Sequence, residues 1–141
     1  MKIATVSLNS IWEDKSANLI QVEKIINSLK GRTEYLIFPE MTLSGFSIKN
    51  IDLAENIDNS NSIRKIRKLA KENKINILFG LMTNKKNKIY NSCICINSKG
   101  DIECIYDKIH LFDVSVPKGE SHKESRYFVA GHQAVVAQSA L

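Results

Sequence analysis

Two short runs of apolar residues, each preceded by an amphipathic segment, constrain the fold of this chain most. The runs are residues 35–38 (YLIF), which are apolar throughout, and 75–82 (INILFGLM), which contain one polar residue, Asn76. Such runs are typical of strands buried on both faces. Strands that alternate with helices predict a layered α/β fold. In the segments before the runs, apolar residues recur at helical spacing: Leu19, Val22, Ile25, Ile26 and Leu29, then Ile63, Ile66, Leu69 and Ala70.

Polar residues indicate where these two helices begin. Asp14 or Ser16 can cap the first helix, and Ser60 or Ser62 the second, because their side-chain oxygens can accept from free backbone N–H groups. Gly31 is expected to end the first helix.

The segments on either side of this pattern extend the sheet. Residues 2–8 alternate apolar and polar side chains and predict an opening strand. Residues 88–97 and 102–106 flank the turn sequence NSKGD and predict an antiparallel hairpin. A further strand is expected to begin at residues 134–137. We therefore predict one domain with a mixed sheet and helices on one face.

Two stretches show little periodicity. Residues 43–57 are expected to be irregular, and residues 108–131 form a long connection. Long connections in compact domains are often functional.

Composition narrows the class of protein. The chain has 141 residues, 43% of them hydrophobic and 25% charged, as in ordinary globular domains. It has neither a run near the ~20 apolar residues of a membrane span nor a signal-like N-terminus, so we predict a cytoplasmic protein with no membrane partner. The net charge of +5 is dispersed, which favours a solvated basic face. A nucleic-acid-binding α/β domain stays open as an alternative.

The three cysteines, Cys93, Cys95 and Cys104, lack the spacing of metal ligands. We interpret them as reduced structural residues, with Cys93 and Cys95 on opposite faces of one strand.

Two charged residues directly follow expected strands, where catalytic groups of layered α/β folds gather. Glu40 comes after residues 35–38 and Pro39, and a carboxylate there could act as a general base. Lys108 follows the hairpin and could stabilise an oxyanion. Taken singly, each is better explained as a strand-end charge that faces water.

The other candidates are less specific. His110 has apolar neighbours and is expected to be a hydrogen-bonded structural residue, whereas His122 and His132 are expected at the surface. Glu120 and Glu124 are two further acids in the long connection, and the residues alone do not rank them.

Together these pieces resemble the nitrilase superfamily of carbon–nitrogen hydrolases, and in particular its amidase-like branch. The resemblance covers nearly the whole chain. It is carried, in the family's order, by KIATVSLNS, LIFPEMTLSGF, YNSCICINSKGDIECIYDKIHLF and GESHKESRYFVAG.

The resemblance implies roles for three residues. In the family the glutamate after the F-P pair is the general base, which corresponds to Glu40. The lysine of K-x-H-L-F stabilises the tetrahedral intermediate, which corresponds to Lys108. A second glutamate, a few residues before an aromatic residue and a glycine, orients the site, and Glu124 matches it best. The resemblance implies no cofactor and no metal.

The resemblance also implies that part of the family's machinery lies outside this sequence. The family's nucleophile is a cysteine on a later strand, and no residue here matches it, so we expect the isolated chain to be inactive. The family packs two sheets face to face between helices. This chain would supply the first half of that α-β-β-α sandwich, with one apolar sheet face uncovered.

The expected partners are a small amide or nitrile substrate and either further copies of the chain or a missing C-terminal half. No nucleic acid is expected. The alternative function is a non-catalytic remnant or interaction module that uses the uncovered sheet face. The sequence does not separate an amidase from a nitrilase, a carbamoylase or an acyltransferase.

Overall fold

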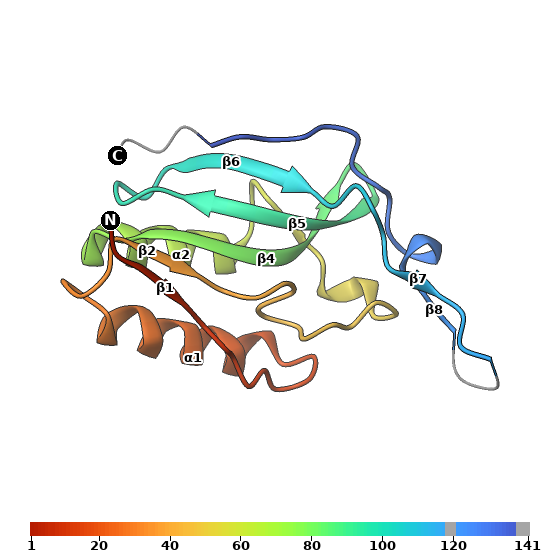
Figure 1. Cartoon of the computed structure of the whole chain (residues 1–141), viewed down its shortest axis with the longest axis horizontal. Helices are drawn as coiled ribbons and strands as arrows, with labels where there is room; N and C mark the ends of the chain where they lie inside the picture. The colour runs from red at the N-terminus through yellow and green to blue at the C-terminus, as the bar shows by residue number, and fades with distance from the viewer. Residues whose placement is uncertain (118–120, 138–141) are drawn as a thin grey trace.

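The computed structural model describes residues 1–117 and 121–137. Its main feature is a mixed sheet with strand order β1-β2-β4-β5-β6, to which β3 adds by pairing with β4 (Figure 1). The strands are β1 (Ile3–Thr5), β2 (Tyr35–Ile37), β3 (Glu55–Asn56), β4 (Asn76–Lys85), β5 (Lys88–Ile96) and β6 (Ile102–Asp107). Strands β1 to β4 pair in parallel, and β4, β5 and β6 pair antiparallel. The β5–β6 pairing is the hairpin that the sequence predicted.

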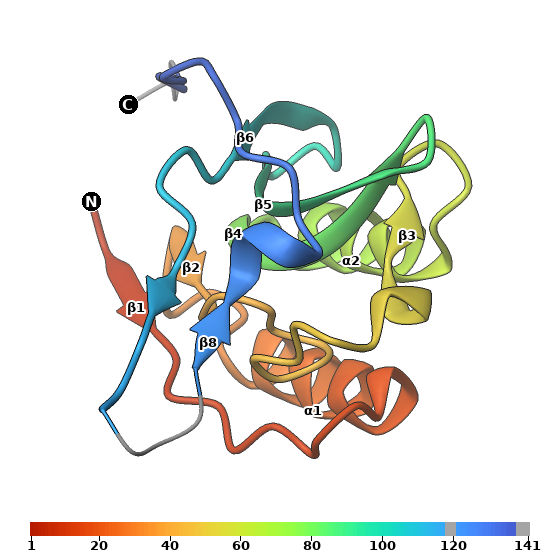
Figure 2. The ribbon, with the colours of Figure 1, turned by 90° about the vertical axis from the view of Figure 1, so that its right-hand side faces the viewer.

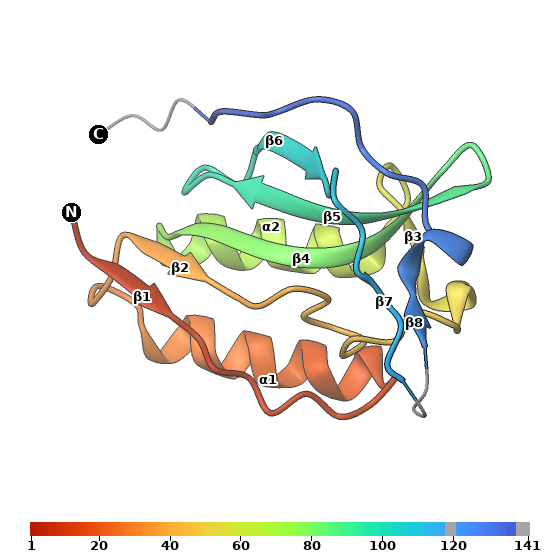
Figure 3. The same cartoon turned by 45° about the vertical axis from the view of Figure 1, so that its right-hand side comes forward.

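Two helices, α1 (Lys15–Ser28) and α2 (Asn61–Asn73), lie beside each other along the sheet (Figure 3). Asp14 caps α1 by accepting from Ala17 N at 2.9 Å. Ser60 caps α2 by accepting from Ile63 N at 2.9 Å. In each pair of candidate caps, the structure selects the first residue.

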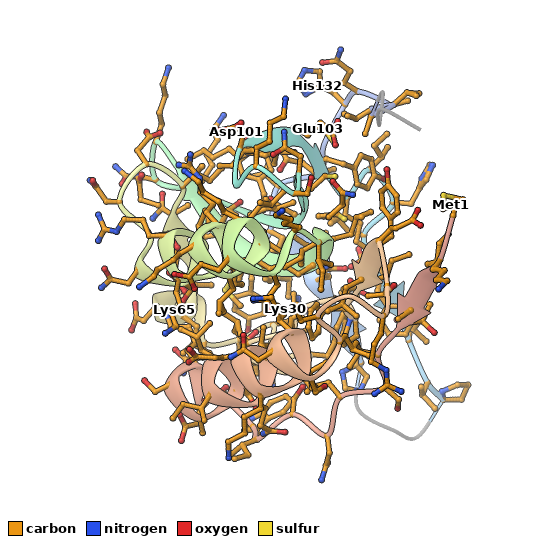
Figure 4. All side chains as sticks on the ribbon, turned by 90° about the vertical axis from the view of Figure 1, so that its left-hand side faces the viewer. Met1, Lys30, Lys65, Asp101, Glu103 and His132 are labelled. Carbon is orange, nitrogen blue, oxygen red and sulfur yellow. The ribbon has the colours of Figure 1, made fainter. Side chains whose placement is uncertain are left out.

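An ion pair and a chain reversal also fix α1. Nζ of Lys65 on α2, the residue labelled in Figure 4, lies 2.7 Å from Oε1 of Glu23 on α1. Gly31, three residues past the end of α1, has a φ of +70°, which suits glycine and lets the chain reverse.

The core fills the space between the helices and one sheet face. Strand alternation directs the buried side chains Leu36, Ile77, Phe79, Ile94 and Ile96 to the same face. The helices supply Val22 and Ile26 from α1, and Ile63, Ile66, Leu69 and Ala70 from α2. The predicted inner face of α2 and the placement of helices on one face are confirmed.

The other face of the sheet carries half-buried side chains and no helix among the described residues. We call it the open face, and it includes Tyr35, Ile37, Leu78, Cys93 and Tyr106. Ile3 at its edge is 51% exposed.

The expectation that Cys93 and Cys95 point to opposite faces was wrong. Residues two apart in a strand share a face, and both cysteines lie on the open face, paired with Gly80 and Leu78.

Several expectations for the irregular segments were also incomplete or wrong. Residues 43–57 contain the 3₁₀ turn η1 (Ile51–Leu53) and β3. The long connection contains a two-stranded ribbon, β7 (Asp113–Val114) with β8 (His122–Lys123), and the 3₁₀ turn η2 (Glu124–Arg126). Residues 134–137 form no strand. They run back beside β6 without joining the ladder (Figures 1 and 3).

No helix in the described part of the chain combines the length and apolar character needed to cross a membrane.

Candidate active site

Glu40 lies just past the carboxyl end of β2, where its backbone crosses closely over β4. Gly80 on β4 makes this crossing possible, because a Cβ there would lie 2.7 Å from Glu40 Cα and 2.5 Å from Met41 N. Thr42 N donates to Gly80 O at 3.0 Å and holds the crossing in place. Pro39 ends the strand since it has no N–H to donate. Pro39 and Gly80 therefore place the Glu40 carboxylate at the end of the sheet.

Lys108 directly follows β6 and continues its pairing with β5. Its N–H donates to Asn91 O at 2.8 Å, and its carbonyl accepts from Gly131 N at 2.9 Å. The residue before it, Asp107, is held by Lys85 Nζ, which lies 2.6 and 2.7 Å from the two carboxylate oxygens. The backbone that carries Lys108 is thus fixed on both sides.

Glu124 reaches the site from η2, and its side chain is fully buried. Figure 2, which looks at this end of the sheet, shows β8 and the turn that follows it in front of the strands. Phe112 N donates to Glu124 Oε2 at 2.7 Å, and Glu124 N donates back to Phe112 O at 3.1 Å. Hydrogen bonds from Ser125 hold the pKa of Asp113 below its ordinary value and tie η2 to β7.

The three residues converge although they come from distant parts of the chain. Lys108 Nζ lies 2.8 Å from Glu40 Oε1 and 3.0 Å from Glu124 Oε2. Burial lowers the Lys108 pKa, but the hydrogen bonds to both carboxylates and their charges outweigh burial, so the pKa lies above its ordinary value. Lys108 therefore stays a cation, placed 5.5 Å from the centre of the Phe46 ring.

Asn91 is a fourth member that the sequence analysis missed. It is buried on β5, and its side-chain amide donates to Glu40 Oε1 and, at 2.8 Å, to Glu124 Oε1. The sequence offered one indication of this role, which is the position of Asn91 in the hairpin. Asn91 is paired opposite Lys108, so it lies at the same end of the sheet as Glu40.

A cavity of about 270 Å³ opens beside these residues. That volume lies below the usual range for drug-sized ligands and fits a small molecule. Its lining includes Glu40, Asn91 and Lys108 together with Phe38, Cys93 and Tyr106.

A somewhat larger cavity, about 340 Å³, lies where the N-termini of α1 and α2 meet. Glu55 is the acidic residue in its lining. The Glu55 carboxylate accepts from Ser60 Oγ at 2.6 Å and from Ser62 Oγ at 2.7 Å, and it lies 3.5 Å from Lys15 Nζ. These bonds give Glu55 a structural role at the start of α2.

The remaining predicted residues lie away from this cluster. His122 and His132 are exposed as expected, but His110 is exposed as well, so its interpretation as a structural residue was wrong. Glu120 lies outside the described residues. Within residues 1–117 and 121–137, no three His, Cys, Asp or Glu side chains are grouped to hold a metal ion.

Relatives of known sequence match this chain over part of their length. It is 31% identical to the omega-amidase NIT3 of Saccharomyces cerevisiae, over 95% of this chain and 50% of that protein. It is 35% identical to the nitrilase and fragile histidine triad fusion protein NitFhit of Drosophila melanogaster, over 79% of this chain and 25% of that one. The chain thus spans half or less of these relatives' length.

Solved structures give the same result for the fold. The structure of Nit3 from S. cerevisiae, a member of branch 10 of the nitrilase superfamily, superposes with a TM-score of 0.80 at 25% identity, over 99% of this chain and 52% of that one. XC1258 from Xanthomonas campestris, a CN-hydrolase superfamily protein, gives 0.83 at 24% identity, over 98% and 49%. The family model for carbon-nitrogen hydrolases matches residues 2–141. The chain belongs to the carbon–nitrogen hydrolase family, in the nitrilase superfamily.

Proposed function

We propose that this chain supplies the base and the oxyanion-binding group of a carbon–nitrogen hydrolase that acts on a small amide or nitrile. The observation that carries the proposal is the Lys108 ammonium held between the carboxylates of Glu40 and Glu124, beside a cavity of about 270 Å³. The omega-amidase relatives favour an amide over a nitrile.

In the proposed reaction, Glu40 accepts the proton of a nucleophile as that nucleophile attacks the carbonyl carbon. The carbonyl oxygen becomes an oxyanion, and the fixed charge of Lys108 stabilises it. Glu40 then gives the proton to the leaving amine, which departs as ammonia from a primary amide. Water, deprotonated by Glu40, then attacks the acyl carbon, the acid is released, and Glu40 returns the proton to the departing nucleophile. Glu124, buried beneath Lys108, orients the ammonium.

The proposal assigns the nucleophile to none of the three cysteines on β5 and β6. Cys93 lines the cavity, but burial and the nearby Cys104 raise the pKa of its thiol, which disfavours the reactive thiolate. Burial, with the hydrogen bond to Glu103, raises the pKa of Cys95 to about 12. With these thiols alone, we propose that the isolated chain does not turn over an amide.

The test has two stages. The purified chain is first assayed for ammonia release from small primary amides, including monoamides of dicarboxylic acids, and the expected rate equals that of Glu40→Gln. The coding DNA beyond the codon for Leu141 is then read in all three frames. A frame that encodes an apolar strand ending in cysteine is expressed as a longer protein.

The longer protein is expected to release ammonia, and Glu40→Gln or Lys108→Met should each lower its kcat at least about 100-fold. The proposal fails if the longer protein hydrolyses no amide or nitrile, or if Glu40→Gln retains full activity. Glu72→Gln, an exposed change on α2, is the matched control and should leave kcat unchanged.

A second candidate is an interaction module without catalysis, which the half-exposed open face favours. It predicts self-association or a bound partner chain over that face. A monodisperse monomer in light scattering, combined with a downstream frame that encodes the cysteine strand, would count against it.

A further inference from the structure

Among the described residues, Asn91 and Lys108 are the two whose side chains contact both carboxylates of the site. Asn91 Nδ2 donates one bond to Glu40 Oε1 and one to Glu124 Oε1, the latter at 2.8 Å. The residue is 4% exposed, so these bonds are shielded from competing water.

The chemistry of the groups fixes which end of the Asn91 amide faces the carboxylates. An ionised carboxylate only accepts hydrogen bonds, and an amide NH₂ offers two N–H donors. Two carboxylates therefore match the two donors of Nδ2. A leucine of similar size could fill the space but could hold neither acid.

The backbone of Asn91 is as well fixed as its side chain. Its carbonyl accepts from Lys108 N at 2.8 Å, and the next residue, Ser92, donates from Oγ to Asp107 at 2.7 Å. Asn91 thus connects the backbone that carries Lys108 with the side chains that Lys108 contacts.

The consequence differs for the two oxygens of Glu40. Oε1 accepts from both Asn91 and Lys108, whereas Oε2 accepts no hydrogen bond from any described residue. The Glu40 side chain is 46% exposed, so without a fixed partner on β5 it could rotate into solvent. Glu124 differs because both of its oxygens are bonded, Oε1 to Asn91 and Oε2 to Lys108 and Phe112 N.

We infer that Asn91 is a positioning residue: it fixes Oε1 of Glu40 against Lys108 and leaves Oε2 as the oxygen that exchanges the proton. The catalytic meaning of this inference rests on the proposed function, but its geometry does not. It also explains why a neutral residue lies between two acids, since a lysine there would pair with Glu40 and compete with Lys108.

The test uses the chain itself and follows Lys108, whose contact with Glu40 depends on where Glu40 is held. The Lys108 side chain is titrated by NMR through its ¹³Cε resonance in wild type and in Asn91→Leu. Loss of the Asn91 bonds is expected to let Glu40 move into solvent. The Lys108 midpoint should therefore fall by at least about half a pH unit.

Asn73→Leu is the matched control. Asn73 is also a buried asparagine whose Nδ2 makes two hydrogen bonds, to Leu69 O at 2.9 Å and Asn27 Oδ1 at 3.0 Å, but it lies on α2. It should lower the free energy of unfolding and leave the Lys108 midpoint unchanged. If Asn91→Leu does not fold, Asn91→Ser, which offers a single and shorter donor, is titrated in its place.

An unchanged Lys108 midpoint in the folded Asn91 variant would overturn the inference and make Asn91 an ordinary buried residue. Equal shifts in the Asn91 and Asn73 variants would overturn it too, because they would reflect general loosening of the fold. No step of this test measures ammonia, so its outcome is independent of the hydrolase assay.

Discussion

The buried carboxylate of Glu124 provides the sharpest test of how the site is held together. Its side chain has no exposed surface, and all three of its side-chain partners are donors: Asn91 Nδ2, Lys108 Nζ and Phe112 N. In Glu124→Gln one acceptor oxygen becomes an NH₂ group of nearly the same size. Whichever way the new amide turns, its NH₂ faces a donor.

The cost of this change follows from the bonds that are lost. If the NH₂ faces Asn91, one charge-assisted bond is lost, and if it faces Lys108 and Phe112, two are lost. Each such bond contributes about 1.5–3 kcal/mol, and breaking a buried ion pair costs about 3–5 kcal/mol. Because Lys108 keeps Glu40 as a partner and is partly exposed, we expect a destabilisation near the lower end, about 3 kcal/mol.

Urea unfolding followed by circular dichroism measures the difference directly. In thermal unfolding the same loss should lower the melting temperature of Glu124→Gln by roughly 10 °C, at about 3 °C per kcal/mol for a chain of this size. Glu72→Gln removes an exposed carboxylate on α2 and should stay within about 0.5 kcal/mol of wild type. If Glu124→Gln also stayed within 0.5 kcal/mol, Glu124 would not be a buried anion satisfied by three donors, and the reasoning would be refuted.

Three further predictions test other parts of the structure. Gly80→Ala should destabilise by about 1–3 kcal/mol in urea unfolding, because its Cβ would lie 2.5 Å from Met41 N, and an effect below 0.5 kcal/mol would contradict the close crossing. Ser60→Ala should cost about 1 kcal/mol, since it removes the cap on Ile63 N, and an unchanged melting temperature would show that the cap is dispensable. The raised Lys108 pKa adds stability that is fully present below the ordinary lysine value of about 10.4 and is lost as pH rises through the folded-state value. Lys108→Met should therefore lose less stability than wild type between pH 9 and pH 11 in urea unfolding, and equal losses would contradict the shift.

Sequence patterns predicted the elements whose residues repeat over several turns or strand positions. The inner face of α2 could be predicted because Ile63, Ile66, Leu69 and Ala70 all point to one side at helical spacing. The two-residue strands β3, β7 and β8 could not, because a pattern of period two needs more than two residues. The strand predicted at residues 134–137 is absent although an apolar run is present. Strand formation also requires a neighbouring strand to pair with, and the sequence pattern does not show whether one is available.

For the site, sequence reasoning found the charged residues and missed the neutral one. Glu40 and Lys108 follow strands, so their meeting at one end of the sheet could be anticipated. The role of Asn91 depends on partners 51 and 33 positions away in sequence, and an asparagine inside a strand gives no local sign of them. Glu124 was placed only through the family resemblance, because the β7–β8 ribbon that brings it to the sheet has no sequence pattern.

The charge balance of the site explains why its two acids have different surroundings. One ammonium between two carboxylates leaves a net negative charge, which is costly to bury fully. Glu124 is buried and has a donor on each oxygen, whereas Glu40 is nearly half exposed and keeps Oε2 open. The excess negative charge therefore lies where water stabilises it and where a proton can be exchanged. Under the proposed function, a nucleophile carried by another segment need only come within reach of Glu40 Oε2, since the other groups are already held by bonds among residues of this chain.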